Sequence, residues 1–179
     1  MTSNKDTELN LEIRDALHTR AGEVLLGSVS GKGLRIGVAC GTFNGGITSR
    51  LLAGTLDVLE EAGVAASDIS ISWAPGAFEL PMLARAYATA PQPYDAVITL
   101  GAVIRGDTGH YDVVAGECAR GVQDVQLTTG VPVVFGVLTT NTIEQALERS
   151  LPDHSNKGRE SAATALEMVS ILRSGSLAH

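Results

Sequence analysis

Short apolar runs alternate along the chain with longer stretches in which apolar residues recur every three or four positions. The run LRIGVAC at 34–40 is rich in small and branched residues and is bounded by Gly33 and Gly41, as is typical of a fully buried strand. Three later runs are also predicted to be strands: 69–73, 96–100 and 131–138. The pattern thus predicts strands separated by helices.

The stretches that follow these runs have helical periodicity. In 47–62 the apolar positions fall three or four residues apart, and Gly63 stands where a helix C-cap is expected. Further helices are predicted at 78–88, 111–127, 142–149 and 158–173. Strands that alternate with helices of this length imply right-handed crossovers and a parallel sheet covered on both faces. The predicted fold class is therefore α/β, a three-layer sandwich around a four-stranded parallel sheet.

The chain before the first strand has a different composition. Residues 1–22 are polar and are expected to form a poorly ordered extension, whereas residues 23–175 are expected to form one domain. The short apolar piece at 24–29 is predicted to be an additional N-terminal edge strand. It could pair with an edge of its own sheet or with the sheet of a neighbouring copy.

Composition and charge narrow the class of protein. Of the 179 residues, 44% are hydrophobic and 18% charged, which fits one compact soluble domain. The formal charge of −7 argues against general nucleic-acid binding. No apolar run approaches the roughly 20 residues that span a bilayer, and no signal peptide is visible. Cys40 and Cys118 are isolated, so we expect a reducing, cytoplasmic location and no zinc site.

The loops after the strands are where a ligand is expected, because an open parallel sheet binds ligands beyond the carboxyl ends of its strands. These loops are 41–46, 75–79, 101–110 and the segment that follows 135–140. Phe43 and Phe78 lie in them, and each ring could stack on a planar heterocycle or close the top of the core. We favour stacking for Phe43 and core closure for Phe78.

Polar residues of the third loop could bind an anion. Gly106-Asp107-Thr108-Gly109 precedes a helix, so its amides and the Thr108 hydroxyl could hold a phosphate, or Asp107 and Thr108 could simply cap the helix. Arg105 and Arg149 are candidate cations, with solvated surface positions as the alternative. His110 could transfer protons or be structural. Glu79 could accept from a hydroxyl or favour a helix dipole.

Several reaction classes lack their sequence signatures. The chain has no phosphate-binding GxxxxGK loop followed by Ser or Thr, no GxGxxG between a strand and a helix, and no GxSxG nucleophile turn. The residues alone therefore indicate a small, polar, planar and phosphorylated ligand without naming a reaction.

Longer segments carry a resemblance to a known family. Five of them occur in that family's order and spacing: TFNGGIT at 42–48, PGAFELP at 75–81, YDAVITLGAVIRGDTGHYDVV at 94–114, PVVFGVLTTNTIEQALERS at 132–150 and NKGRESAATALEM at 156–168. From Val24 to Arg173 the chain resembles the lumazine synthases of riboflavin biosynthesis. The resemblance implies a flavodoxin-like fold, and condensation of 5-amino-6-(D-ribitylamino)uracil with 3,4-dihydroxy-2-butanone 4-phosphate to 6,7-dimethyl-8-ribityllumazine, with release of phosphate and water. It implies no metal and no redox cofactor.

The resemblance also implies roles for single residues. Phe43 resembles the ring that stacks on the pyrimidine, and His110 resembles the residue that moves protons. Contacts to the ribityl chain are implied for Ala77, Phe78 and Glu79, backbone contacts to the heterocycle for Ala102, Val103 and Ile104, and contacts to phosphate for Asp107, Thr108 and Arg149.

An assembly is implied as well. Phe135 and Lys157 match contacts that a neighbouring subunit delivers, so the active site would exist only at an interface. Family members form pentamers, which can pack into sixty-subunit shells and associate with riboflavin synthase, and the segment 24–29 matches an arm that adds a strand to the adjacent subunit. Two alternatives stay open, a carrier of a flavin or phosphorylated metabolite and a structural shell protein without activity.

Overall fold

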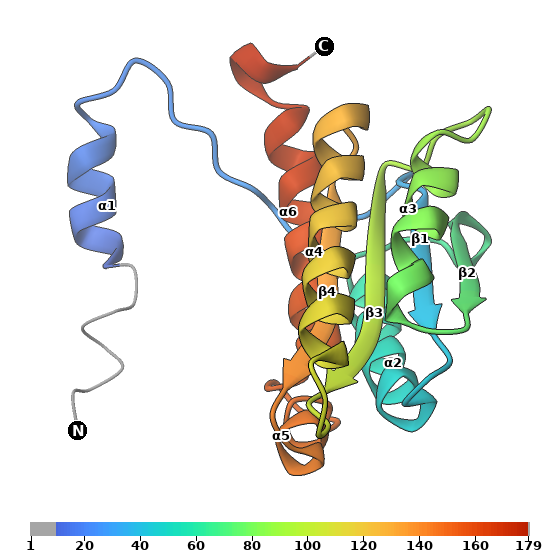
Figure 1. The fold of residues 1–179 in the computed structure, drawn as a ribbon. Coiled ribbons are helices and arrows are strands. Elements are labelled where there is room, and N and C mark those ends of the chain that lie inside the picture. Colours follow the sequence, from blue (N-terminus) through green and yellow to red (C-terminus); the bar gives the residue numbers. More distant parts are fainter. Residues whose placement is uncertain (1–9, 179) are drawn as a thin grey trace.

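The computed structural model describes residues 10–178, and its sheet has four parallel strands (Figure 1). The strands are β1 (Ile36–Gly41), β2 (Ile69–Ala74), β3 (Ala96–Ile104) and β4 (Val133–Thr140). They lie in the order β2-β1-β3-β4. Every residue of β1 is buried, as is expected for a central strand covered on both faces. The predicted α/β class and parallel sheet are confirmed.

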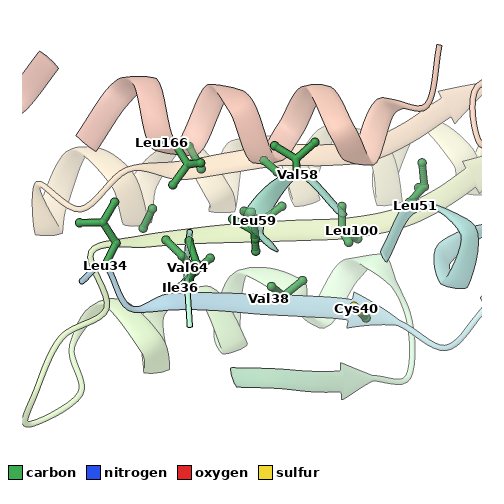
Figure 2. Close-up of a cluster of buried hydrophobic side chains, with 14 of the residues drawn as sticks. Leu34, Ile36, Val38, Cys40, Leu51, Val58, Leu59, Val64, Leu100 and Leu166 are labelled. Atoms are coloured by element: carbon green, nitrogen blue, oxygen red, sulfur yellow. The ribbon is translucent and has the colours of Figure 1, made fainter. Parts of the chain in front are cut away.

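Helices cover both faces of the sheet. The helices are α1 (Leu11–His18), α2 (Gly45–Glu61), α3 (Leu80–Ala88), α4 (His110–Thr129), α5 (Ile143–Glu148) and α6 (Lys157–Leu172). Short 3₁₀ turns add Ala66–Asp68, Ala77–Glu79 and Gly175–Leu177. One apolar cluster joins the sheet to α2 and α6, and a second joins it to α3 and α4. Figure 2 shows the first cluster, in which Leu59 of α2, Leu100 of β3 and Leu166 of α6 meet.

The helices α2 and α6 cross very closely. A Cβ added at Gly158 of α6 would overlap the carbonyl oxygen of Leu51 in α2, so only glycine fits there. The Thr55 hydroxyl donates to the Gly158 carbonyl at 3.0 Å. The buried Asn156 caps α6 by accepting from the Gly158 amide and donates to the Arg50 carbonyl of α2. Close backbone approach therefore fixes one of the two helical layers.

The strand β3 is longer than the sequence pattern predicted. Residues 101–104 were expected in a loop, but they continue β3 and pair with β4 from Gly101–Val137 to Ile104–Thr140. The prediction was wrong because Gly101, a residue type that often ends a strand, here pairs with Val137 and continues β3. Three apolar residues follow that glycine, and a strand that pairs with β4 keeps their backbone groups satisfied. The third loop shrinks to 105–109.

The N-terminal segment differs from expectation in two ways. Residues 24–29 form no strand in this chain's own sheet, so that alternative was wrong. They run beside α6, where the Ser28 and Ser170 hydroxyl oxygens lie 3.0 Å apart. Pairing with a neighbouring copy stays a prediction. Within 1–22, the pattern did not predict the helix α1, whose first amides donate to the Asn10 side chain. Figure 1 shows α1 apart from the sandwich. Residues 1–9 lie outside the described part.

Candidate active site

A cavity of about 660 Å³ opens at the carboxyl ends of β1, β2 and β3, beside the first turns of α4. Nine of the residues singled out in the sequence line it: Phe43, Ala77, Phe78, Glu79, Ala102, Val103, Ile104, Thr108 and His110. Its volume lies within the range of small-molecule pockets. The topology explains the position, since the β1 and β3 crossovers leave the central strands towards opposite faces and open a crevice there.

Backbone pairing holds Phe43 at the cavity rim. The Thr42 amide donates to the Ala74 carbonyl at 2.8 Å, and the Phe43 amide donates to the Pro75 carbonyl at 3.0 Å. These bonds continue the β1–β2 ladder beyond its last paired residues. The Phe43 side chain is 72% exposed, so its ring does not close the core. It offers one apolar face to whatever enters the cavity.

Phe78 also lines the cavity, and the expectation that it closes the core was wrong. Its side chain is 54% exposed. The 3₁₀ turn at Ala77–Glu79 gives the core positions to Ala77 and to Leu80, both of which are buried. Phe78 and Glu79 therefore stay on the exposed side of the turn, where both face the cavity.

The end of β3 forms the floor of the cavity. Ala102 and Val103 are buried and Ile104 is half-buried. Because strand side chains alternate, Ala102 packs in the α2/α6 cluster while Val103 packs in the α3/α4 cluster. What this strand end can give a ligand is chiefly its backbone groups.

The loop before α4 adds polar groups to the cavity lining. Thr108 and His110 line the cavity, and both are exposed. The N-cap of α4 is Gly109, which has no side chain to cap the helix; the His110 amide donates to the Thr108 hydroxyl at 3.4 Å. The positive end of the α4 dipole thus faces the cavity with little side-chain capping. Asp107 is exposed in the same loop and does not line the cavity.

Arg105 is already paired within its own chain. Its guanidinium donates to Asp112 of α4 at 2.9 Å and to the Asn141 side chain at 3.2 Å, and it lies 4.1 Å from the centre of the Tyr111 ring. The hydrogen bond with Asp112 raises the pKa of Arg105 above its ordinary value. Arg105 therefore joins the ends of β3 and β4 to the start of α4 instead of offering a free cation.

Three predicted residues lie elsewhere in this chain. Phe135 is in the edge strand β4, Arg149 follows α5, and Lys157 begins α6. The Arg149 guanidinium donates to the Gln145 carbonyl at 3.0 Å, and Lys157 pairs with Glu160. The helix α5 packs in the α2/α6 cluster, on the face away from α4. The structure does not bring these three residues to the cavity of their own chain.

One wall of the cavity was not predicted from the sequence. Tyr111, Val113 and Val114 of α4 line it with His110. Helical periodicity could have found Val113 and Val114, because residues three and four positions after His110 share its face, whereas Tyr111 has no such signal. Pro75, Gly76 and Gly106 also line the cavity and belong to loops that were expected to do so.

Neither metal ligands nor reactive thiols gather at this site. Within residues 10–178 there is no group of three or more His, Cys, Asp or Glu side chains placed to hold a metal ion. Both cysteines are buried, and burial raises the pKa of the Cys40 thiol to about 12. Burial, with a smaller effect of Glu79, also raises the pKa of Cys118 to about 12. The chemistry that this site offers is stacking, hydrogen bonding and proton transfer.

A comparison with protein families agrees with this geometry. The family model of 6,7-dimethyl-8-ribityllumazine synthase matches residues 33–173. The chain belongs to the lumazine synthase family. Lumazine synthases are enzymes of riboflavin biosynthesis that act on small molecules and typically assemble into oligomers. The whole cavity lies within the matched residues, whereas α1 and the segment 24–29 lie outside them. Within residues 10–178, none of the helices has the length and hydropathy of a membrane-spanning segment.

Proposed function

We propose that the chain catalyses the condensation of 5-amino-6-(D-ribitylamino)uracil with 3,4-dihydroxy-2-butanone 4-phosphate to give 6,7-dimethyl-8-ribityllumazine, phosphate and water. One observation carries the proposal: the exposed Phe43 ring and the thinly capped start of α4 line the same cavity. A planar ring and a phosphate can therefore be held in it together. The reaction takes place in the cytoplasm.

The pyrimidine occupies the side of the cavity near Phe43. Its ring stacks on the Phe43 side chain, which gains about 1 kcal/mol beyond the burial of area. Its polar edge meets the backbone groups of Ala102, Val103 and Ile104. The ribityl hydroxyls lie along the turn at 77–79, where the Glu79 carboxylate can accept hydrogen bonds.

The phosphate of the second substrate binds at the start of α4. The free amides of the first turn and the Thr108 hydroxyl are its donors, and the helix dipole favours its charge. Asp107 contributes through its backbone, since its carboxylate would repel phosphate. His110, the first residue of α4, lines the same cavity and moves protons as the Schiff base forms, phosphate leaves and the new ring closes with loss of water.

A neighbouring subunit completes each cavity. Phe135, Arg149 and Lys157 lie away from the cavity of their own chain. No Arg or Lys is among the described residues that line the cavity, so a bound phosphate would need cations from elsewhere, and Arg149 and Lys157 can supply them. Assembly into pentamers delivers all three across the interface. Sixty-subunit shells and an association with riboflavin synthase are the larger assemblies we propose.

The direct test mixes the purified, assembled chain with both substrates and follows the fluorescence of the lumazine. We expect product and phosphate to be released in equal amounts, with neither formed when one substrate is omitted. Assembled protein that forms no lumazine would refute the proposed reaction. A coloured ligand that stays bound without turnover would favour a carrier instead.

Subunit exchange tests the shared cavity. Phe43→Ala and Lys157→Ala should each lower activity, because each removes a different side of the same cavity. Dissociating the two variants, mixing them in equal amounts and reassembling them should restore about a quarter of the wild-type activity, since random neighbours pair an intact Phe43 with an intact Lys157 that often. If the mixture regains nothing, the two residues do not serve one cavity from two subunits.

A further inference from the structure

Asn44 has an uncommon backbone conformation at the edge of the cavity. Its φ is 59° and its ψ is 30°, in the left-handed region, and within residues 10–178 it is the one residue other than glycine with a positive φ. Such a conformation is costly for most side chains and is best tolerated by glycine and asparagine. Glycine adopts this φ at no cost, and two glycines, Gly45 and Gly46, follow in the sequence. The φ alone therefore does not explain why position 44 is an asparagine.

The Asn44 side chain explains why the turn uses asparagine. Its Nδ2 donates to the Ala102 carbonyl at 2.8 Å. Pairing between β1 and β3 ends at Cys40–Leu100, whereas pairing between β3 and β4 continues to Ile104–Thr140. The Ala102 carbonyl on the β1 side has therefore lost its strand partner, and the Asn44 amide takes the place of that partner.

The same residue connects three parts of the site. Its carbonyl accepts from the Ile47 amide at 2.9 Å and so begins α2, its side chain holds the cavity floor at Ala102, and its backbone carries Phe43. A Cβ added at Gly45 or Gly46 would meet nothing within 4 Å, and the Phe43 side chain is mostly exposed. Apart from the backbone bonds of Thr42 and Phe43 to β2 and Pro75, the Asn44 side chain is thus the contact that ties this turn to the end of β3.

We propose that Asn44 is a positioning residue: its left-handed turn and its hydrogen bond to Ala102 hold the Phe43 ring over the end of β3, at the spacing that a stacked heterocycle needs. The inference rests on the proposed function for the identity of that heterocycle. Asparagine combines the two properties, whereas glycine and ionised aspartate accept the conformation but have no side-chain donor.

The kinetic test compares Asn44→Gly and Asn44→Asp with the wild type. Both keep the turn and lose the hydrogen bond, so we expect the KM for the ribityl pyrimidine to rise about tenfold, well inside the hundredfold that a misplaced group can cost. The KM for the butanone phosphate should stay close to wild type, whereas the melting temperature should fall in both variants, because the Ala102 carbonyl loses its donor in each. Asn10→Gly, at the N-cap of α1, is the matched control and should change neither KM. An unchanged pyrimidine KM, or an equal rise in both KM values, would overturn the inference.

A second measurement needs no substrate. Phe43→Trp in a Trp73→Phe background leaves one tryptophan, at the position of the stacking ring. Adding Asn44→Gly should speed the local decay of its fluorescence anisotropy, and Asn10→Gly should not. An unchanged decay would overturn the positioning role. If the wild type made no lumazine, the proposed reaction would fail while this measurement would still decide what Asn44 does.

Discussion

His110 is the side chain best placed to move protons, yet its loss should not abolish the reaction. The proposed condensation joins an amine to a reactive carbonyl, and holding two reactants together supplies much of the acceleration. General acid–base catalysis typically contributes about a hundredfold to ten-thousandfold. Because His110 is exposed, removing its ring costs the fold little.

His110→Ala should therefore fold normally and keep measurable turnover, with a kcat that falls by no more than the roughly ten-thousandfold that general acid–base catalysis typically supplies. Steady-state assays of the purified variant check the prediction. Complete loss of activity with an unchanged melting temperature would mean that proton transfer, and not the pairing of substrates, dominates the acceleration.

The two cysteines give a prediction about pH. Burial raises the pKa of both Cys40 and Cys118 from an ordinary value of 9.0 to about 12, so the thiols stay protonated in the folded chain. The thiolate is the reactive form, and a thiol reagent at pH 8 should label neither cysteine until the protein is unfolded. The unfolded chain loses these protons earlier, so the free energy of unfolding should fall as the pH rises from about 9 towards 12. Rapid labelling of native protein at pH 8 would contradict this.

At the scale of elements, the crossing of α2 and α6 is the most sensitive contact. Gly158→Ala would push a methyl group into the Leu51 carbonyl, and such overpacking typically lowers the free energy of unfolding by about 1–3 kcal/mol. Gly116→Ala in α4 is the matched control, since a Cβ there meets nothing within 4 Å and alanine favours helix. Urea unfolding should show a loss for the first variant and none for the second. Equal stabilities would show that the helices can separate at little cost.

The loop between β3 and α4 depends on Arg105 in another way. Arg105→Lys keeps the charge but loses the planar group that lies on Tyr111 and donates to both oxygens of Asp112. The pair is exposed, so stability should hardly change. The KM for the butanone phosphate should rise, because the loop that carries Thr108 loosens. Arg120→Lys, whose pairs with Glu117 and Asp124 lie farther along α4, should leave both KM values unchanged. A matching rise there would point to a general effect of charge geometry on α4.

Much of the fold could be predicted from periodicity, because burial in the core determines which positions of each strand and helix are apolar. The run at 34–40 and the strand Ile36–Gly41 coincide within two residues at the start, since burial on both faces leaves a continuous apolar signal. The end of β3 and the helix α1 could not be found in this way. The first depends on pairing with a strand distant in sequence, and the second has no buried residue to create a pattern.

Only part of the candidate site could be predicted from the sequence pattern. Strand ends pointed to the cavity, and the lone Phe43 among glycines suggested an exposed ring. The exposure of Phe78 could not be predicted, because the 3₁₀ turn at Ala77–Glu79 determines which residues of that turn face the core. The positions of Arg149 and Lys157 depend on which face of the sheet α5 packs against, and the local sequence pattern does not predict that face.

For the whole molecule, the lone tryptophan can report assembly. Trp73 lies on the edge strand β2 and is 48% exposed in the single chain. If the segment 24–29 of a neighbour adds to this edge, assembly should shield the ring, shift its fluorescence to shorter wavelength and protect it from acrylamide. Removing residues 1–31 should reverse these changes. Equal quenching in assembled and dissociated protein would show that another surface forms the interface.

The two ends of the sandwich serve different purposes, which matters for anyone who wishes to attach cargo to the chain. The strands end on the side where the cavity opens, whereas α6 finishes at the far end of the sandwich (Figure 1). Beyond α6 the Ser176 amide donates to Glu23 at 3.1 Å. A fluorescent protein or an antigen fused beyond α6 would therefore be attached on the side away from the entrance. Such a fusion should remain an active catalyst while it displays its passenger.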